Sequence, residues 1–262
     1  MLGAIIGDIV GSVYEFDNIK TKDFPLFRGD EFYTDDTVMT CAVAEALMDR
    51  SEGTLEQKAV KWMRKLGRRH PGAGYGGRFA EWLKSEDPRP YNSYGNGSAM
   101  RVSPCGLIAK TLEEAASLSK KVTAITHDHP EGIKGAEATA TCVCLAKHHW
   151  TKEGILYHVR SRYYPMDFTL DEIRPTYKFN ETCQKTVPQA LQAFFESTSF
   201  EDALRNAVSV GGDTDTLAAI TCSVAGAFYG IDRELKEKAL SILPEDLKKT
   251  CEKWEKFIAT RS

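Results

Sequence analysis

Two short acidic segments carry the residue types that could do chemistry in this chain. Thr34-Asp35-Asp36-Thr37 lies directly before one Ala-rich stretch, and Gly211-Gly212-Asp213-Thr214-Asp215-Thr216 lies at the start of another. A helix start needs one Ser, Thr or Asp as its cap, and acidic groups there complement the helix dipole. Each segment holds two carboxylates, which is more than capping requires.

A cation site explains the surplus of acid better, provided that the two helix starts meet in space. Four carboxylates brought together would repel and raise each other's pKa unless a cation neutralised them. The donors would all be oxygen atoms, which suits Mg²⁺, Mn²⁺ or Ca²⁺ and argues against Zn²⁺ or Cu. Four carboxylates also exceed what one Mg²⁺ takes from protein and are compatible with two ions. The expected metal ligands are Thr34, Asp35, Asp36, Asp213, Asp215 and Thr216.

The elements that must position these residues read as helices, and alternating strands are absent. Apolar spacing predicts helices over 38–48, 112–124, 134–147, 187–195, 200–209 and 213–229, with turns at 70–77, 87–97 and 129–132. Gly3, Gly7 and Gly11 fall on one face of a first helix, and small residues such as Ala218 recur near the C-terminal end. Small side chains let helix axes approach closely, so we expect these two helices to pack together. One all-α domain over residues 1–262 is the simplest interpretation.

Composition and charge exclude several function classes. The chain has 262 residues with 34 Lys+Arg and 37 Asp+Glu, so its net charge of −3 offers no broad surface for generic nucleic-acid binding. Its seven cysteines are odd in number and contain no CxxC pair, which indicates reduced thiols in the cytoplasm. The N-terminal apolar run is interrupted by Asp8 and Glu15 and is too short to span a bilayer. We therefore expect a cytoplasmic protein that does not bind membranes, and a monomer.

The ordered set of motifs resembles the ADP-ribosylglycohydrolases, the family of dinitrogenase reductase-activating glycohydrolase and the ADP-ribosylhydrolases. Any one motif is short, but together they run along the whole chain in the family's order. Gly-Ser-Val-Tyr-Glu and Ser-Tyr-Gly-Asn-Gly are most similar to the branch of the serine-ADP-ribose hydrolase. The motifs are residues 7–15, 33–37, 74–76, 93–101, 126–127, 187–188 and 211–216.

The resemblance implies a fold, a cofactor and a set of catalytic residues. The fold would be a compact, single-domain orthogonal helix bundle with a central dinuclear cleft for two Mg²⁺ or Mn²⁺ ions. Its metal ligands would be the six residues already selected by spacing. Glu15, Asp35 and Asp36 would be catalytic, with Glu15 as general base, general acid or gate. Without the resemblance, Glu15 reads as a solvated glutamate at a helix end.

The same resemblance implies contacts to ADP-ribose. Backbone N–H groups of a glycine-rich loop can face a pyrophosphate, a histidine can donate to a phosphate, and a tyrosine can stack on adenine. Asn92 departs from the branch, which tends to have Gly there. The expected substrate-binding residues are Gly74, Tyr75, Gly76, Tyr91, Ser93, Tyr94, Gly95, Asn96, Gly97, His127 and Gly211.

The predicted activity is Mg²⁺-dependent hydrolysis of the glycosidic bond between ADP-ribose and an acceptor. The acceptor stays open among serine, arginine, a nucleobase, acetyl-ADP-ribose and poly(ADP-ribose), because residues 150–185 match the family poorly. The alternative function is a non-catalytic ADP-ribose-binding module or an interaction protein, such as a toxin-immunity protein.

Overall fold

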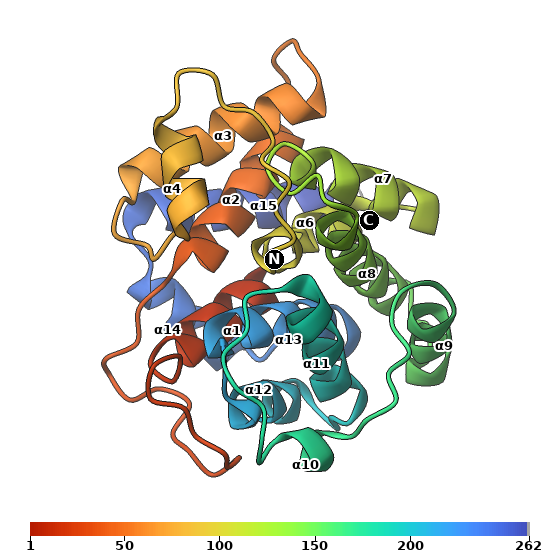
Figure 1. Cartoon of the computed structure of the whole chain (residues 1–262). Coiled ribbons are helices and arrows are strands. Elements are labelled where there is room, and N and C mark those ends of the chain that lie inside the picture. Colours follow the sequence, from red (N-terminus) through yellow and green to blue (C-terminus); the bar gives the residue numbers. More distant parts are fainter. Residues whose placement is uncertain (261–262) are drawn as a thin grey trace.

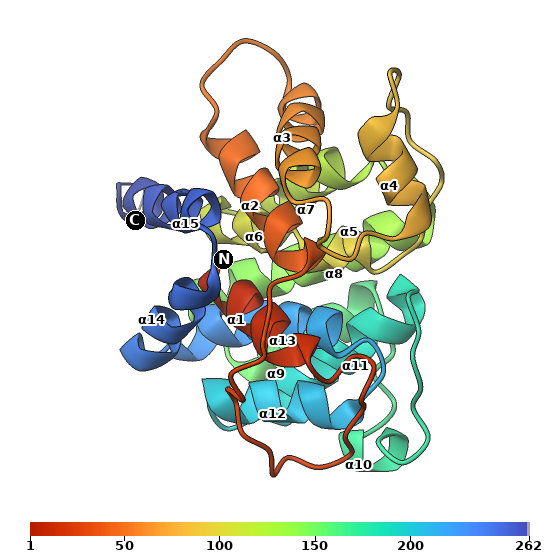
Figure 2. The same ribbon diagram turned by 90° about the vertical axis from the view of Figure 1, so that its left-hand side faces the viewer.

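Two helices that pack without intervening side chains form the centre of the molecule. They are α1 (Leu2–Ser12) and α13 (Thr214–Tyr229). A Cβ atom on Gly7 would lie 2.2 Å from the carbonyl oxygen of Ala218, and one on Gly3 would lie 2.1 Å from that of Cys222. Only glycine permits this approach. The predicted packing of the glycine stripe against the Ala-rich helix is therefore confirmed (Figures 1 and 2).

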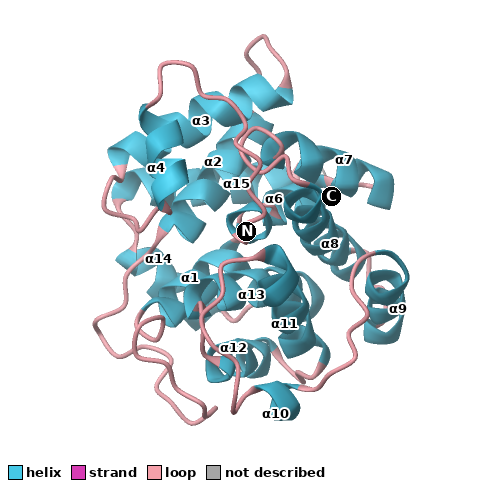
Figure 3. Ribbon diagram, in the orientation of Figure 1, coloured by secondary structure: helices cyan, strands magenta, loops and turns pink. Residues whose placement is uncertain are grey.

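The computed structural model describes residues 1–260, and helices are the only extended regular elements in this range (Figure 3). Gly95 and Thr182 add one isolated antiparallel bridge. The all-α fold class is thus confirmed. Besides α1 and α13, the helices are α2 (Asp35–Met48), α3 (Leu55–Arg69), α4 (Gly77–Lys84), α5 (Gly97–Met100), α6 (Ser103–Ile108), α7 (Leu112–Thr123), α8 (Pro130–Lys147), α9 (Lys152–Arg162), α10 (Leu170–Ile173), α11 (Cys183–Phe195), α12 (Phe200–Val210), α14 (Arg233–Ile242) and α15 (Glu245–Ala259).

The other helices surround the central pair on all sides. In Figure 1, α11 and α12 lie below α13, and α2 lies above α1 with α3 and α15 packed on it. Helix α8 packs on α13, and both α6 and α7 pack on α8. The buried core is continuous through these layers, from Leu2 to Trp254. Both acidic helix starts, those of α2 and α13, therefore sit against α1.

One predicted turn is wrong. Residues 129–132 form the first turn of α8 instead of a loop, and the helix begins at Pro130. Proline is well accommodated at the first helical position, because the N–H that it lacks would have no helical partner there. The side chain of His129 accepts from the N–H of Glu131 and caps this start (3.1 Å). The predicted turns at 70–77 and 87–97 are largely irregular, as expected.

Two further observations bear on the sequence expectations. All seven cysteines are buried free thiols. Within residues 1–260, no helix combines the length and apolar character that crossing a bilayer requires.

Candidate active site

Asp8, in the middle of α1, is hydrogen-bonded to the start of α2. Its fully buried carboxylate accepts hydrogen bonds from the backbone N–H groups of Thr34 (3.0 Å) and Thr37 (3.1 Å). It also accepts from the hydroxyl of Thr34 (2.7 Å) and from that of Thr37. Thr34 in turn caps α2, because its Oγ1 accepts from the N–H of Asp36 (3.3 Å). The first turn of α2 is therefore held rigidly on α1.

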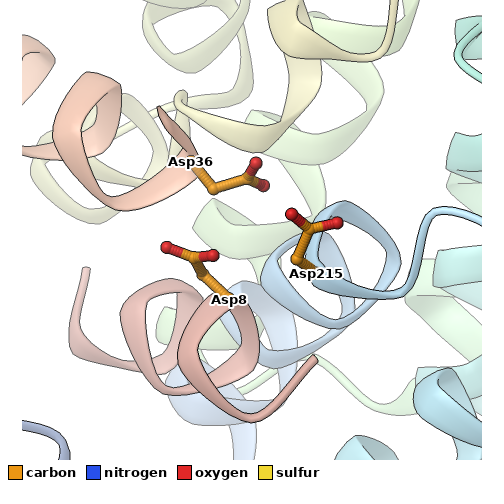
Figure 4. Close-up of side chains that lie close together, drawn as sticks. All are labelled: Asp8, Asp36 and Asp215. Carbon is orange, nitrogen blue, oxygen red and sulfur yellow. The ribbon is translucent and has the colours of Figure 1, made fainter. Parts of the chain in front are cut away.

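The two acidic helix starts meet at this point. Carboxylate oxygens of Asp8, Asp36 and Asp215 all lie within 4.8 Å of one another. Figure 4 shows the three side chains converging from α1, α2 and α13. The hydroxyl of Thr216 donates to Oδ2 of Asp36 across the gap (3.2 Å). Segments separated by most of the chain thus share one buried site, as the sequence argument required.

A second carboxylate group shares Asp215 with the first. Oxygens of Glu15, Asp213 and Asp215 also lie within 4.8 Å of one another. Asn96 donates its amide to Oδ2 of Asp213 (2.7 Å) and so orients that carboxylate. Asp35 belongs to neither group and lines the adjoining cavity.

The electrostatics of the site follow from burial and crowding. Burial, followed by the charge of Asp215, raises the pKa of Asp8 to about 7 and that of Glu15 to about 8. The same two causes, in the same order, raise the pKa values of Asp35, Asp36 and Asp213 well above their usual range. Protons or a cation must balance carboxylates held this close.

The donor set fits a hard divalent cation. Every candidate ligand atom is a carboxylate or hydroxyl oxygen, the type that Mg²⁺ and Mn²⁺ prefer. Oδ1 of Asp36 is buried and has no hydrogen-bond partner. A buried polar atom without a partner is costly, and a cation would satisfy it.

A cavity of about 380 Å³ opens beside both carboxylate groups. Its volume falls in the range of about 300–1,000 Å³ that is typical of ligand pockets. Glu15, Asp35, Asp213 and Asp215 contribute an acidic part of its lining. The remainder includes a group of cationic and aromatic side chains, namely Arg78, Phe79, Tyr91, Arg101 and His127. The guanidinium of Arg78 lies 4.8 Å from the centre of the Tyr91 ring.

The hydrogen bonds of His127 make it a donor into the cavity. The guanidinium of Arg101 donates to Oγ1 of Thr126 (2.7 Å) and faces Nδ1 of His127 (3.5 Å). Because a guanidinium can only donate, it favours an Nδ1 that accepts, here from Oγ1 of Thr126 (2.7 Å). Nδ1 then accepts, so the neutral ring carries its proton on Nε2, the atom nearer to Gly95 and Gly97. Burial, with help from Arg101 and Arg78, holds the pKa of His127 well below its usual value. Arg101 itself is buried, and its Nε has no partner.

The structure places most of the predicted substrate-binding residues around this cavity. The lining includes Gly74, Gly76, Tyr91, Ser93, Gly95, Asn96, Gly97 and His127. It does not include Tyr75, Tyr94 or Gly211. The ring of Tyr94 is 46% exposed and lies 5.1 Å from that of His129, while Tyr75 packs against Phe79. A Cβ atom on Gly211 would lie 2.8 Å from Nζ of Lys20 and 3.1 Å from Oδ1 of Asn18.

Sequence reasoning missed several residues of the site, among them Asp8, Arg78 and Arg101. Asp8 gave a usable signal, since a lone carboxylate in an otherwise apolar, glycine-striped helix needs a buried partner. Arg101 stands at the end of the Ser93–Arg101 motif, but a single arginine in a motif does not show that it is buried. Arg78 gave no signal, because it resembles any exposed helical arginine.

Asn92, the departure noted in the sequence, keeps the backbone conformation that glycine favours. Its φ is +54°, in the left-handed region, which asparagine tolerates better than most residues. Its N–H donates to Oδ1 of Asp128 (2.7 Å). The substitution therefore leaves the turn before Ser93 intact.

Comparisons with known proteins agree with this geometry. The family model described as ADP-ribosylglycohydrolase matches residues 1–261. Human ADP-ribosylhydrolase ARH3 is 26% identical over 97% of this chain and 88% of its own length. ADP-ribosylarginine hydrolase Tri1 of Pseudomonas putida (strain GB-1) is 28% identical over 88% of this chain and 70% of its own length.

A solved structure supports the same assignment at the level of the fold. A chain titled "ADP-ribosylglycohydrolase-related protein complex" superposes with a TM-score of 0.69 and 25% identity, covering 95% of this chain and 94% of that one. The chain described here belongs to the ADP-ribosylglycohydrolase family and is a hydrolase of glycosyl bonds.

Proposed function

We propose that this protein removes ADP-ribose from a modified acceptor by hydrolysing the glycosidic bond at the ribose. The observation that carries the proposal is the composition of one cavity. Its lining joins an oxygen-rich carboxylate cluster to a cationic and aromatic group. ADP-ribose has matching parts: ribose hydroxyls, a pyrophosphate and a flat adenine. The hydrolase names of the similar proteins support the same substrate class.

We propose two Mg²⁺ or Mn²⁺ ions as cofactors. Thr34, Asp35, Asp36, Asp213, Asp215 and Thr216 would hold them, and the unpartnered Oδ1 of Asp36 supports this assignment. When bound, such ions would coordinate sugar hydroxyls and lower the pKa of a coordinated water molecule.

Glu15 is the proposed general base. It is half-buried within reach of Asp213 and Asp215, and not a solvated glutamate at a helix end. Burial and its acidic neighbours raise its pKa, which strengthens it as a proton acceptor. In the proposed step, Glu15 takes a proton from water while the water oxygen bonds to the ribose carbon. The bond from that carbon to the acceptor breaks, and the departing acceptor oxygen or nitrogen keeps the electron pair and takes a proton from solvent, while Glu15 later releases its proton to solvent.

The other part of the lining would bind the rest of the substrate. Nε2 of His127 and the guanidinium of Arg101 are donors suited to the pyrophosphate. Gly95 and Gly97 permit close approach there, because neither carries a side chain. Tyr91, flanked by Arg78 and His127, offers a ring face for adenine. We propose that residues 1–262 act as one domain, since the core is continuous through all layers.

Release of free ADP-ribose from a substrate panel tests the proposal. The panel would hold serine-linked and arginine-linked ADP-ribosyl peptides, acetyl-ADP-ribose and poly(ADP-ribose), each assayed with Mg²⁺ and with EDTA. We expect Mg²⁺-dependent release from at least one member, and loss of at least about 100-fold in activity in Asp213→Asn. Asp232→Asn is the matched control, because Asp232 also begins a helix (α14) but is exposed. Binding of ADP-ribose without release from any member would contradict the hydrolase proposal.

A further inference from the structure

The segment that carries Glu15 is attached to the second acidic helix start by one side-chain amide. Asn18 donates from Nδ2 to the carbonyl oxygens of Tyr14 (2.7 Å) and Glu15 (2.8 Å). The same nitrogen lies 3.0 Å from the carbonyl oxygen of Gly212, and the N–H of Gly212 donates back to Oδ1 of Asn18 (2.6 Å). The two hydrogens of Nδ2 are thus shared among three carbonyl oxygens, and Oδ1 accepts from the residue that precedes Asp213.

The two glycines of this turn make room for protein and not for a ligand. Gly211 and Gly212 have φ values of +71° and +81°, which favour glycine. A Cβ atom on Gly211 would lie 2.8 Å from Nζ of Lys20 and 3.1 Å from Oδ1 of Asn18. Lys20 adds a second attachment, because its Nζ donates to the carbonyl oxygens of Tyr177 (2.8 Å) and Val210 (2.5 Å). Gly211 therefore lets the segment after Glu15 approach the α13 start, whereas a Cβ atom on Gly212 would lie 2.5 Å from Cε1 of Tyr177.

Glu15 lies beyond the end of α1, between a buried and an exposed stretch of the chain. Tyr14 before it is buried in the core, whereas Phe16 and Asp17 after it are exposed, Phe16 to 86%. A segment with few buried contacts depends on its hydrogen bonds for a fixed position. Asn18 holds the Glu15 carbonyl on one side and the Gly212 backbone on the other.

We propose that Asn18 is a positioning residue that sets Glu15 against Asp213 and Asp215. The inference rests on the proposed function, in which Glu15 is the general base. Asn18 lies outside the cavity lining and acts through the backbone that it joins. Loss of the amide contacts would free the Glu15 segment from the α13 start.

A double-mutant cycle tests the coupling to catalysis. Asn18→Ala and Asn18→Asp should each lower kcat by roughly 10- to 100-fold with KM nearly unchanged, since small misplacements of a catalytic group cost this much. In a Glu15→Gln background, Asn18→Ala should have no further effect, because the group that it positions is already disabled. Asp17→Ala, an exposed neighbour, is the control. If Asn18→Ala lowers kcat by the same factor in the Glu15→Gln background as in wild type, the proposal is overturned.

Amide hydrogen exchange gives a second readout that needs no turnover. Asn18→Ala should speed exchange of residues 13–18 and of the Gly212 N–H by about tenfold or more, whereas Asp17→Ala should not. Unchanged exchange would show that Asn18 does not hold the segment and would also overturn the proposal. If exchange accelerates but the wild-type protein releases no ADP-ribose, the hydrolase proposal fails and the positioning of Glu15 stands.

Discussion

At the scale of single residues, the site depends on polar groups whose partners are distant in sequence. The carboxylate of Asp8 binds two backbone N–H groups and two hydroxyls at the start of α2. These bonds hold the first turn of α2, and with it Asp36, close to Asp215. His127 is held by its sequence neighbour Thr126 and by the more distant Arg101.

His127 makes the stability of the protein depend on pH. Its pKa is lowered in the folded protein, so below about pH 6.5, its ordinary value, the unfolded chain binds a proton that the folded chain rejects. Stability from this group is therefore complete above that pH and is lost as the pH falls. We expect the difference in free energy of unfolding between wild type and His127→Gln to shrink by up to about 1.4 kcal/mol per pH unit below 6.5.

Denaturant titrations from pH 5 to 8 measure this difference. Other groups titrate alike in both proteins, so the comparison isolates His127. The control is His149→Asn, since His149 is exposed and its backbone φ of +60° is tolerated by asparagine. A difference between wild type and His127→Gln that stays constant with pH would contradict the lowered pKa.

At the scale of elements, the packing of α1 on α13 brings the acids together. Asp8 lies within α1 and Glu15 just beyond it, while Asp213 directly precedes α13 and Asp215 lies in its first turn. The distance between the two helix axes therefore controls the distance between the carboxylates. The small residues of the two segments predicted this contact, because three glycines four residues apart mark a single face of the first helix and alanines such as Ala218 recur in the second.

Gly7→Ala should destabilise the protein severely. The new Cβ would meet backbone atoms of Ala218 and Ala219, which cannot move aside as a side chain can. We expect a loss of about 3 kcal/mol or more in the free energy of unfolding, at the upper end for overpacked cores. The matched control is Gly77→Ala in α4, where nothing lies within 4 Å of the new Cβ atom. That substitution should be neutral or stabilising, because alanine is the better helix former. Equal thermal unfolding curves for the two variants would contradict this account of the packing.

At the scale of the whole molecule, sequence patterns predicted which segments lie close together. They did not predict which individual side chains of those segments face one another. Runs such as 112–124 and 213–229 are recognisable because their apolar residues recur at helical spacing. The grouping of Asp36 with Asp8, and of Asp215 with both acid groups, depends on how α2 and α13 are rotated about their axes. That rotation follows from tertiary packing and from the hydrogen bonds of Asp8, and no local pattern records it. The burial of Arg101 and the contact of Gly212 with Asn18 are long-range in the same sense.

The acidic cluster also couples cation binding to the stability of the whole fold. An ion that binds only the folded protein stabilises it, by about 2.7 kcal/mol at a concentration of 100 times its Kd. We therefore expect Mg²⁺ to raise the Tm of the chelated protein and EDTA to lower it again. Asp36→Asn should remove most of this shift. In EDTA above neutral pH, Asp36→Asn should be at least as stable as wild type, because burial and its neighbours raise the pKa of Asp36 and make its ionised form costly. In Mg²⁺, wild type should instead have the higher Tm of the two proteins.

Calorimetry of wild type, Asp36→Asn and the exposed control Asp232→Asn, each with Mg²⁺ and with EDTA, measures these shifts in Tm. A wild-type Tm that is the same in both conditions would count against a cation site formed by these carboxylates.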